Sequence, residues 1–251
     1  MIGRDTSWRI LLWALALLWA ASAPVTVQAK DAVALELVLA VDTSASVDNA
    51  EFRLQMGGIA NGFRHPDVIA AIKAQGALGI AVTLVQWSAG DQQVQSVGWH
   101  RLYDRGSALA FANAVDRAPR MFAVNTTAIG SALRFSAALF WSSPYAGERR
   151  SIDVSGDGNS NAGLIAAKER DRVVAAGITI NGLAILNGHI KLDRYYRINV
   201  IGGPGSFVLV AEDFSDFARA MREKLMREIS PAIALRSVPA RIMLASRHHP
   251  R

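Results

Sequence analysis

The sequence predicts an α/β fold, with a doubly wound, mainly parallel sheet, helices on both faces and one short antiparallel edge strand. Apolar stretches of strand length alternate along the chain with segments whose apolar residues have helical spacing, a pattern typical of parallel sheets. The first stretch begins at Val33 and is rich in Val and Leu, as expected for a strand buried on both faces.

The first half of the chain supplies three strands and three helices. The opening strand ends in Asp42-Thr43-Ser44-Ala45-Ser46, and Asp48 and Glu51 have the spacing of a helix-opening capping box. The expected elements that follow are a helix over 48–73 with a break near His65-Pro66, strands over 80–87 and 94–99 that pair at one edge, a helix over 107–115, and a helix over 128–141 opened by Asn125-Thr126-Thr127.

The second half continues the alternation. We expect a strand over 151–155, a helix over 162–176 with Gly177 as its C-cap, strands over 178–186 and 207–210, and a last helix that starts after Asp213 or Ser215 and runs to about residue 229. Gly202-Gly203-Pro204-Gly205 reads as a turn, since it lacks the Lys-Ser/Thr of a phosphate loop. Tyr195 and Tyr196 are assigned to an irregular segment with a packing role.

Residues 1–29 have the pattern of a secretory signal peptide. Arg4 and Arg9 precede an apolar run over 10–23, and Val27-Gln28-Ala29 places small or β-branched residues at the −3 and −1 positions of a cleavage site. Cleavage after Ala29 would export the protein to the periplasm or the cell surface. An uncleaved membrane anchor is the alternative, although the run is short for a span of about 20 residues.

The charge is unevenly distributed along the chain. The whole sequence has a net charge of +6, and residues 230–251 form a basic tail with four arginines and no acid. The domain over 30–229 is therefore close to neutral, which excludes a nucleic-acid-binding domain on charge. Membrane contact is expected only through the signal anchor or the basic tail. The absence of cysteine excludes thiolate metal sites and cysteine nucleophiles.

Five oxygen-bearing side chains stand at strand ends or helix starts. They are Asp42, Ser44, Ser46, Thr127 and Asp157. A doubly wound sheet gathers the loops at the carboxyl ends of its strands along one edge, where ligands bind. Hard oxygen donors in this number suit Mg²⁺, or Mn²⁺ or Ca²⁺ in its place.

Each of these residues also has a purely structural alternative. Ser46 or Asp48 could cap the first helix, Thr127 could cap the helix that follows it, and Asp157-Gly158 could form a turn. The D-x-S-x-S spacing is a weak signal by itself. The apolar strand before it, the helix after it and the two downstream loops in the right order favour a metal site.

The segments DTSAS, TTAIGSAL and VSGDGNSN resemble the metal-ion-dependent adhesion site of von Willebrand factor A domains, which integrin I domains share. Asp42, Ser44 and Ser46 match its first part, Thr127 its second and Asp157 its third, and the resemblance covers about residues 33–229. GDGNSN and INVIGGPGSFV further resemble an exported bacterial branch classed as a domain of unknown function. The resemblance implies that the hydroxyls contact the metal directly or nearly so, and that at least one Asp acts through water.

The expected function is that of a binding module that engages a protein or other ligand through an Asp or Glu carboxylate on the metal, without catalysis. The sequence has no G-x-S-x-G or H-E-x-x-H motif, its five histidines are scattered, and no general base stands beside the motif. A metal-dependent hydrolase and a scaffold with a vestigial metal site are the alternatives.

Overall fold

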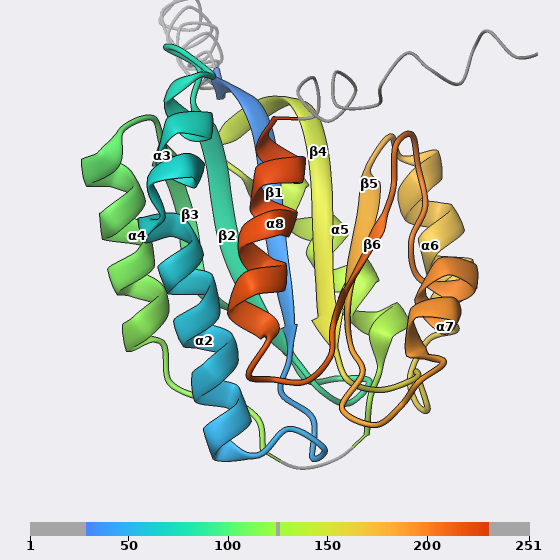
Figure 1. The fold of residues 1–251 in the computed structure, drawn as a ribbon. Helices are drawn as coiled ribbons and strands as arrows, with labels where there is room; N and C mark the ends of the chain where they lie inside the picture. The colour runs from blue at the N-terminus through green and yellow to red at the C-terminus, as the bar shows by residue number, and fades with distance from the viewer. Residues whose placement is uncertain (1–28, 124–125, 231–251) are drawn as a thin grey trace, which may run out of the picture. The chain divides into compact units, whose positions relative to one another are not determined.

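The structure is a computed structural model that describes residues 29–123 and 126–230. Its central feature is a mixed sheet of six strands. The described elements belong to one compact unit that begins at Asp31. The strand order is β3-β2-β1-β4-β5-β6 (Figure 1). The strands are β1 (Asp31–Asp42), β2 (Ile80–Trp87), β3 (Gln93–Leu102), β4 (Tyr145–Gly156), β5 (Thr179–Ile185) and β6 (Val208–Ala211).

The first strand of the chain lies at the centre of the sheet. β1 pairs in parallel with β2 on one side and with β4 on the other, and β5 and β6 continue the parallel pairing. Only β3 is antiparallel, and it pairs with β2 at the edge. The predicted sheet, with its antiparallel edge strand, is confirmed.

Seven helices cover the two faces of the sheet within the described residues. One face carries α2 (Asn49–Arg64), α3 (Pro66–Lys73), α4 (Arg105–Arg117) and α8 (Phe217–Ile229). The other carries α5 (Ile129–Ser142), α6 (Ala166–Ala175) and α7 (Leu192–Asn199) (Figure 1). β1 contributes alternate side chains to both cores, Leu37 and Leu39 to the first and Val38 and Ala40 to the second.

Two glycines allow α2 and α8 to pack closely. Gly58 and Gly62 lie one helical turn apart on α2. A methyl group at Gly58 would come within 2.6 Å of Phe217, and one at Gly62 within 2.8 Å of Leu225. A side chain at Gly58 would press on Phe217 and on the α8 backbone at Ala218, whereas one at Gly62 would require the tip of Leu225 to move.

Four predicted elements differ from the structure, and one of them is the last helix, which begins at Phe217 after Asp216 and not after Asp213 or Ser215. β4 begins at Tyr145 because the polar stretch before Ser151 pairs with the first half of β1. α6 begins only at Ala166, since Gly163 has a φ of +67°, which a helix does not allow. The segment assigned as irregular around Tyr195 and Tyr196 is the helix α7, short and flanked by glycine-containing turns.

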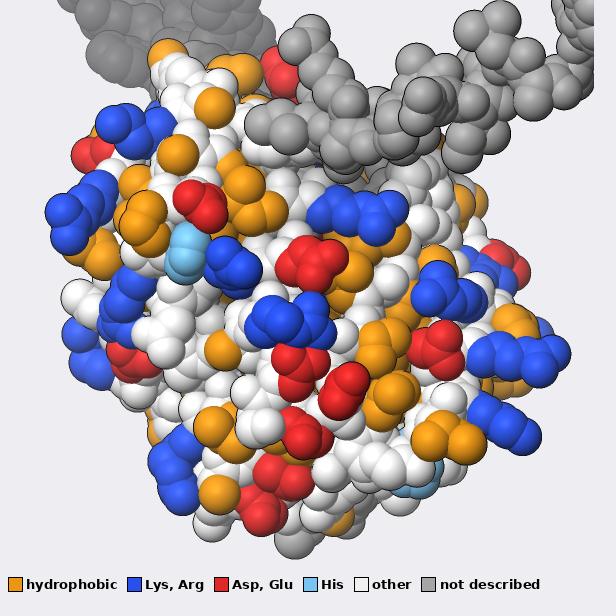
Figure 2. All heavy atoms as spheres, viewed as in Figure 1, with side chains coloured by type: hydrophobic (Ala, Val, Ile, Leu, Met, Phe, Trp, Pro, Cys, Tyr) orange, Lys and Arg blue, Asp and Glu red, His pale blue; other side chains and the backbone are white. Residues whose placement is uncertain are grey.

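Acidic and basic side chains are interspersed on the face that α2, α4 and α8 form (Figure 2). Ion pairs join several of them, including Arg64 with Asp116 and Arg219 with Asp216 and Glu223. Across residues 29–123 and 126–230, no helix combines the length and the apolar character needed to cross a membrane. The predicted signal peptide and most of the basic tail lie outside the described residues.

Candidate metal centre

The candidate centre begins with Asp42, the last residue of β1. Its side chain is 0% exposed, because β2 and β4 flank the strand on both sides. Asp42 Oδ1 accepts a hydrogen bond of 2.8 Å from the Ser44 amide. Asp42 Oδ2 is buried and has no hydrogen-bond partner among the described residues.

Burial raises the pKa of the Asp42 carboxyl to about 7. The hydrogen bonds from Ser44 lower it in part, the negative charge of Asp157 raises it further, and Arg120 has a small opposing effect. A buried carboxylate is costly unless a cation or several donors compensate its charge. The described residues supply only part of that compensation.

Hydrogen bonds connect the side chains of Ser44, Ser46, Thr127 and Asp157 into one network, which Asp42 joins through the Ser44 amide. Ser44 Oγ lies 3.2 Å from Ser46 Oγ, and Ser46 Oγ donates to Asp157 Oδ1 at 2.8 Å. Thr127 Oγ1 lies 3.4 Å from Ser44 Oγ. The structure therefore brings together three loops: the one after β1, the one before α5 and the one after β4.

The hydrogen bonds also show which residues cap α2 and α5 and which are left for the candidate metal site. Asp48 caps α2, and with Glu51 it forms the predicted capping box, which leaves Ser46 to bond Asp157. α5 begins at an N-cap, Ala128, that has no side-chain capping bond. The Thr127 hydroxyl thus faces Ser44 instead of closing the helix.

Arg120 fixes the loop after β1, a role that the sequence did not predict. Its guanidinium donates to the carbonyl oxygens of Thr43 and Ser44 at 3.2 and 3.3 Å, and also to that of Val47. The same side chain donates to Asn49 Oδ1 at 2.9 Å. These bonds are all to backbone or amide groups, so Arg120 shapes the loop and leaves the Asp42 carboxylate free of a direct ion pair.

The loop after β4 in turn positions Thr127. Asn161 Oδ1 accepts from the Thr127 amide at 2.8 Å, and the Asn161 amide donates back to the Thr127 carbonyl at 2.9 Å. Ser160 Oγ lies 3.3 Å from the same carbonyl, and its amide donates to Tyr195 Oη at 3.2 Å. Asn161 and Ser160 are thus further residues of the site that spacing alone did not identify.

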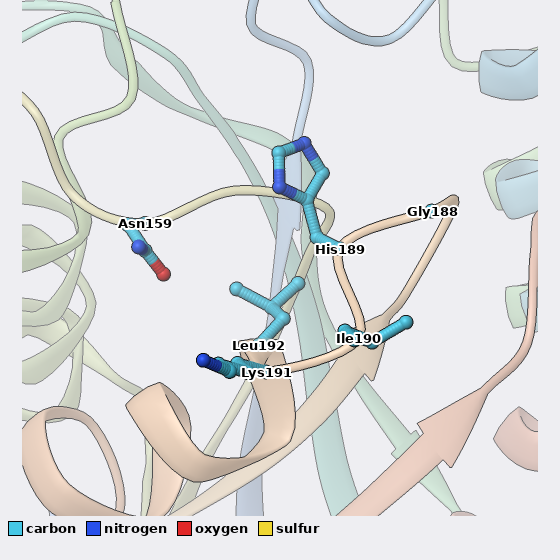
Figure 3. A pocket seen from close by; sticks show the side chains of 6 residues that line it. All are labelled: Asn159, Gly188, His189, Ile190, Lys191 and Leu192. Carbon is cyan, nitrogen blue, oxygen red and sulfur yellow. The ribbon is translucent and has the colours of Figure 1, made fainter.

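A small pocket lies beside the loop after β4. It has a volume of about 280 Å³ and is lined by Asn159, which is two residues beyond Asp157, by the β5–α7 connection from Gly188 to Lys191, and by Leu192 at the start of α7. Figure 3 shows Asn159 on one side and the connection, with His189 and Lys191, on the other.

The donor set fits a divalent cation. Two carboxylates and three hydroxyls converge, and the unpartnered Asp42 Oδ2 is a free acceptor of the kind that a hard cation or its water shell would satisfy. Nowhere in the described residues do three or more His, Cys, Asp or Glu side chains form a cluster that could hold a metal ion. The hydroxyls would therefore be essential members of the site.

Solved structures define the class of the fold. The chain is similar to proximal thread matrix protein 1 from the mussel byssus, in a structure described as having a zinc-occupied MIDAS motif (TM-score 0.56, 16% identity, covering 80% of this chain and 49% of that one). It is also similar to a von Willebrand factor type A protein from Catenulispora acidiphila (0.52, 18%, 79% and 43%). A third similar structure is the vWF domain of the type V pili tip protein Mfa5 from Porphyromonas gingivalis (0.55, 11%, 80% and 96%).

These likenesses establish a von Willebrand A-like fold. The chain spans about half the length of the mussel protein. No curated protein matches it in sequence. The chain belongs to the family described as "Protein of unknown function (DUF1194)", which matches residues 32–233.

Proposed function

We propose that this protein is an exported, metal-dependent binding module that engages a partner through a divalent cation. Asp42, Ser44, Ser46, Thr127 and Asp157 would hold Mg²⁺, or Mn²⁺ or Ca²⁺. The observation that carries the proposal is a network of four of these side chains, joined to Asp42 through the Ser44 amide, beside an Asp42 carboxylate oxygen that is buried and lacks a partner among the described residues.

The composition of the site supports binding of an acidic group. Three of the five donors are neutral hydroxyls, and a carboxylate that acts through water neutralises a cation less than a direct ligand does. The cation would keep electrophilic character and an open position for the carboxylate of a partner's Asp or Glu. Ser46 is exposed, so the centre opens to solvent on its side.

A hydrolase at the same centre has less support. Within the described residues, no histidine or lysine hydrogen-bonds to any of the five side chains. Arg120, which packs against the loop after β1, is engaged with backbone oxygens. A group that activates water must reach it at hydrogen-bond distance, and His189 and Lys191 line the neighbouring pocket instead.

Calorimetric titration of the full chain with Mg²⁺ and Mn²⁺ tests the metal site. We expect Asp42→Ala to abolish binding and Thr127→Ala to weaken it, while both variants stay folded. Ser142→Ala, which removes an exposed hydroxyl at the far end of α5, is the matched control and should bind like the wild type. A wild type that binds no divalent ion would make the site vestigial and refute the proposal.

Affinity capture from native extract, with Mg²⁺ in one arm and chelator in the other, tests the partner. A protein that is retained with Mg²⁺, released by chelator and not captured by Asp42→Ala supports the binding module. Metal-dependent turnover of generic phosphoester substrates, lost in Asp42→Ala, would support the hydrolase instead.

Export is tested separately by mass spectrometry of the protein recovered from its cells. The proposed cleavage after Ala29 gives a mature chain that begins at Lys30, one residue before β1. A protein that retains Met1 and fractionates with membranes would instead support the anchor.

A further inference from the structure

Tyr196 on α7 occupies a slot that two glycines create. A methyl group at Gly182 of β5 would come within 2.7 Å of the Tyr196 ring, and one at Gly156 of β4 within 2.9 Å of its hydroxyl. The ring therefore lies against two neighbouring strands at positions without side chains. Tyr196 is 0% exposed, and α7 contributes only Leu192 as a second buried side chain.

Within this slot, the Tyr196 hydroxyl lies near the Asp42 carboxylate. The same methyl group at Gly156 would lie 2.8 Å from Asp42 Oδ2, so both oxygen atoms border one bare stretch of β4. Neither Tyr196 Oη nor Asp42 Oδ2 has a hydrogen-bond partner in the described part of the chain. A buried donor thus stands near a buried acceptor, and both are unsatisfied.

Simple packing does not account for this arrangement. Phenylalanine would fill the same slot without burying a hydroxyl, and an unpartnered buried hydroxyl costs about 1–3 kcal/mol. Burial and the nearby charges of Asp42 and Asp157 raise the pKa of Tyr196 well above its usual range, so the hydroxyl stays a neutral donor. Buried polar groups of this kind are commonly satisfied by ordered water.

We propose that Tyr196 is a positioning residue of the metal centre, whose hydroxyl holds the Asp42 carboxylate through one ordered water between Tyr196 Oη and Asp42 Oδ2. The inference rests on the proposed metal site and adds a residue from an element that supplies none of the five predicted donors. A carboxylate oxygen has two lone pairs, so Oδ2 can accept from this water and still face the cation or its water shell. With Oδ1 fixed by the Ser44 amide and Oδ2 by this water, the carboxylate has one orientation toward the cation. Such outer contacts are worth about 10–100-fold in metal affinity.

Calorimetric titration of the full chain with Mn²⁺ tests this, with Tyr196→Phe compared with wild type. We expect the dissociation constant to rise about 10–100-fold, while the melting temperature without metal stays within about 2 °C of wild type, because phenylalanine fills the same slot with nearly the same volume. Tyr145→Phe, the same change at the opposite end of β4, is the control and should leave the dissociation constant unchanged. A Tyr196→Phe variant with wild-type affinity overturns the proposal.

The outcomes separate this inference from the proposed function. A wild type that binds no divalent ion refutes both, whereas a wild type that binds and a Tyr196→Phe variant that binds equally well refute only the role of Tyr196. If Tyr196→Phe fails to fold, a crystal structure of the wild type with Mg²⁺ decides. A water within about 3.2 Å of both Tyr196 Oη and Asp42 Oδ2 supports the proposal, and its absence overturns it.

Discussion

Asp42 shows how a strand that is suited to burial can end in a charged group. The apolar residues before Asp42 are buried in the sheet along β1, and the Asp42 carboxylate at the end of the strand is buried with them. One oxygen is stabilised by the Ser44 amide, and the other has no partner among the described residues. Burial raises the pKa of Asp42, and the hydrogen bonds from Ser44 offset that rise only in part.

Gly156→Ala is expected to damage the site although it removes no donor. The added methyl group would lie within 3 Å of both Asp42 Oδ2 and Tyr196 Oη, so the carboxylate and α7 must shift. We expect metal binding to fall by at least tenfold and the free energy of unfolding to fall by about 1–3 kcal/mol, as measured by calorimetry and denaturant titration. Gly98→Ala on β3, where nothing lies within 4 Å, is the control. Equal behaviour of the two variants would contradict the close approach.

The five donors could be predicted from sequence because each follows a recognisable start or end of an element. Arg120 and Asn161 could not, since their contacts join segments 34 to 77 residues apart and involve backbone atoms that carry no sequence signal. Tyr196 was missed for another reason. Its slot is visible only when Gly156 and Gly182 are known to lie on neighbouring strands.

At the scale of elements, two adjacent glycines of α2 differ in the space around them. Gly57 has open space around it, whereas its neighbour Gly58 is in contact with α8. Gly57→Ala should raise the free energy of unfolding by about 0.5–1 kcal/mol, because alanine favours the helix. Gly58→Ala should lower it by about 1–3 kcal/mol through overpacking against Phe217. Denaturant titration of both variants tests the pair, and a destabilised Gly57→Ala would show that α2 is packed differently.

α8 also carries a buried polar cluster against β4 and β5. Lys224 Nζ lies 3.0 Å from Asp153 Oδ1 and 3.5 Å from Glu228 Oε1. Glu228 further accepts hydrogen bonds from Ser151 Oγ at 3.0 Å and from Asn181 Nδ2 at 2.7 Å. One ammonium group therefore faces two buried carboxyls.

This cluster predicts a pH dependence of stability. Burial raises the pKa of Asp153 from its ordinary value of 3.8 to about 6, Lys224 offsets part of this rise, and Glu228 adds to it. The folded state therefore binds the proton more tightly than the unfolded state, so the free energy of unfolding should fall as pH rises from 4 to 6. In metal-free protein, Asp42, whose pKa is about 7, contributes with the same sign.

Asp153→Asn isolates this effect. The variant should lose up to about 1.4 kcal/mol per pH unit of the downward slope between pH 4 and 6, and it should keep the part that Asp42 contributes. Denaturant titrations at several pH values without metal provide the measurement. An unchanged slope would mean that Asp153 stays ionised in the folded protein across this range.

Helices and strands with long apolar patterns were predicted well, and β2 was predicted to the residue. The errors fall where local pattern and tertiary context disagree. The polar start of β4 is a strand only because β1 pairs with it, and the two turns of α7 are helical in a stretch where charged and amide residues are as numerous as apolar ones. The last helix was expected to follow a cap at Asp213 or Ser215, and α8 instead begins after Asp216 without a side-chain capping bond.

For the molecule as a whole, deleting residues 231–251 should leave the melting temperature within about 2 °C of the full chain. The end of α8 is already satisfied within the domain, because Arg149 donates to the Glu228 carbonyl at 3.1 Å and Gln75 to the Ile229 carbonyl at 3.1 Å. Thermal unfolding of the truncated chain, with the full chain as control, is the measurement. A large fall would show that the tail completes the core.

The central place of β1 bears on the order in which the chain can assemble. It is synthesised before the other described strands, yet one of its two partners, β4, begins at Tyr145, 114 residues after the start of β1 at Asp31. Until β4 is made, an apolar strand has an unpaired edge, a state prone to aggregation. Pairing over such a separation is also slow. Because Asp157 follows β4 directly, the metal centre would be completed only by this late step. Cation binding would therefore show that β4 has paired with β1.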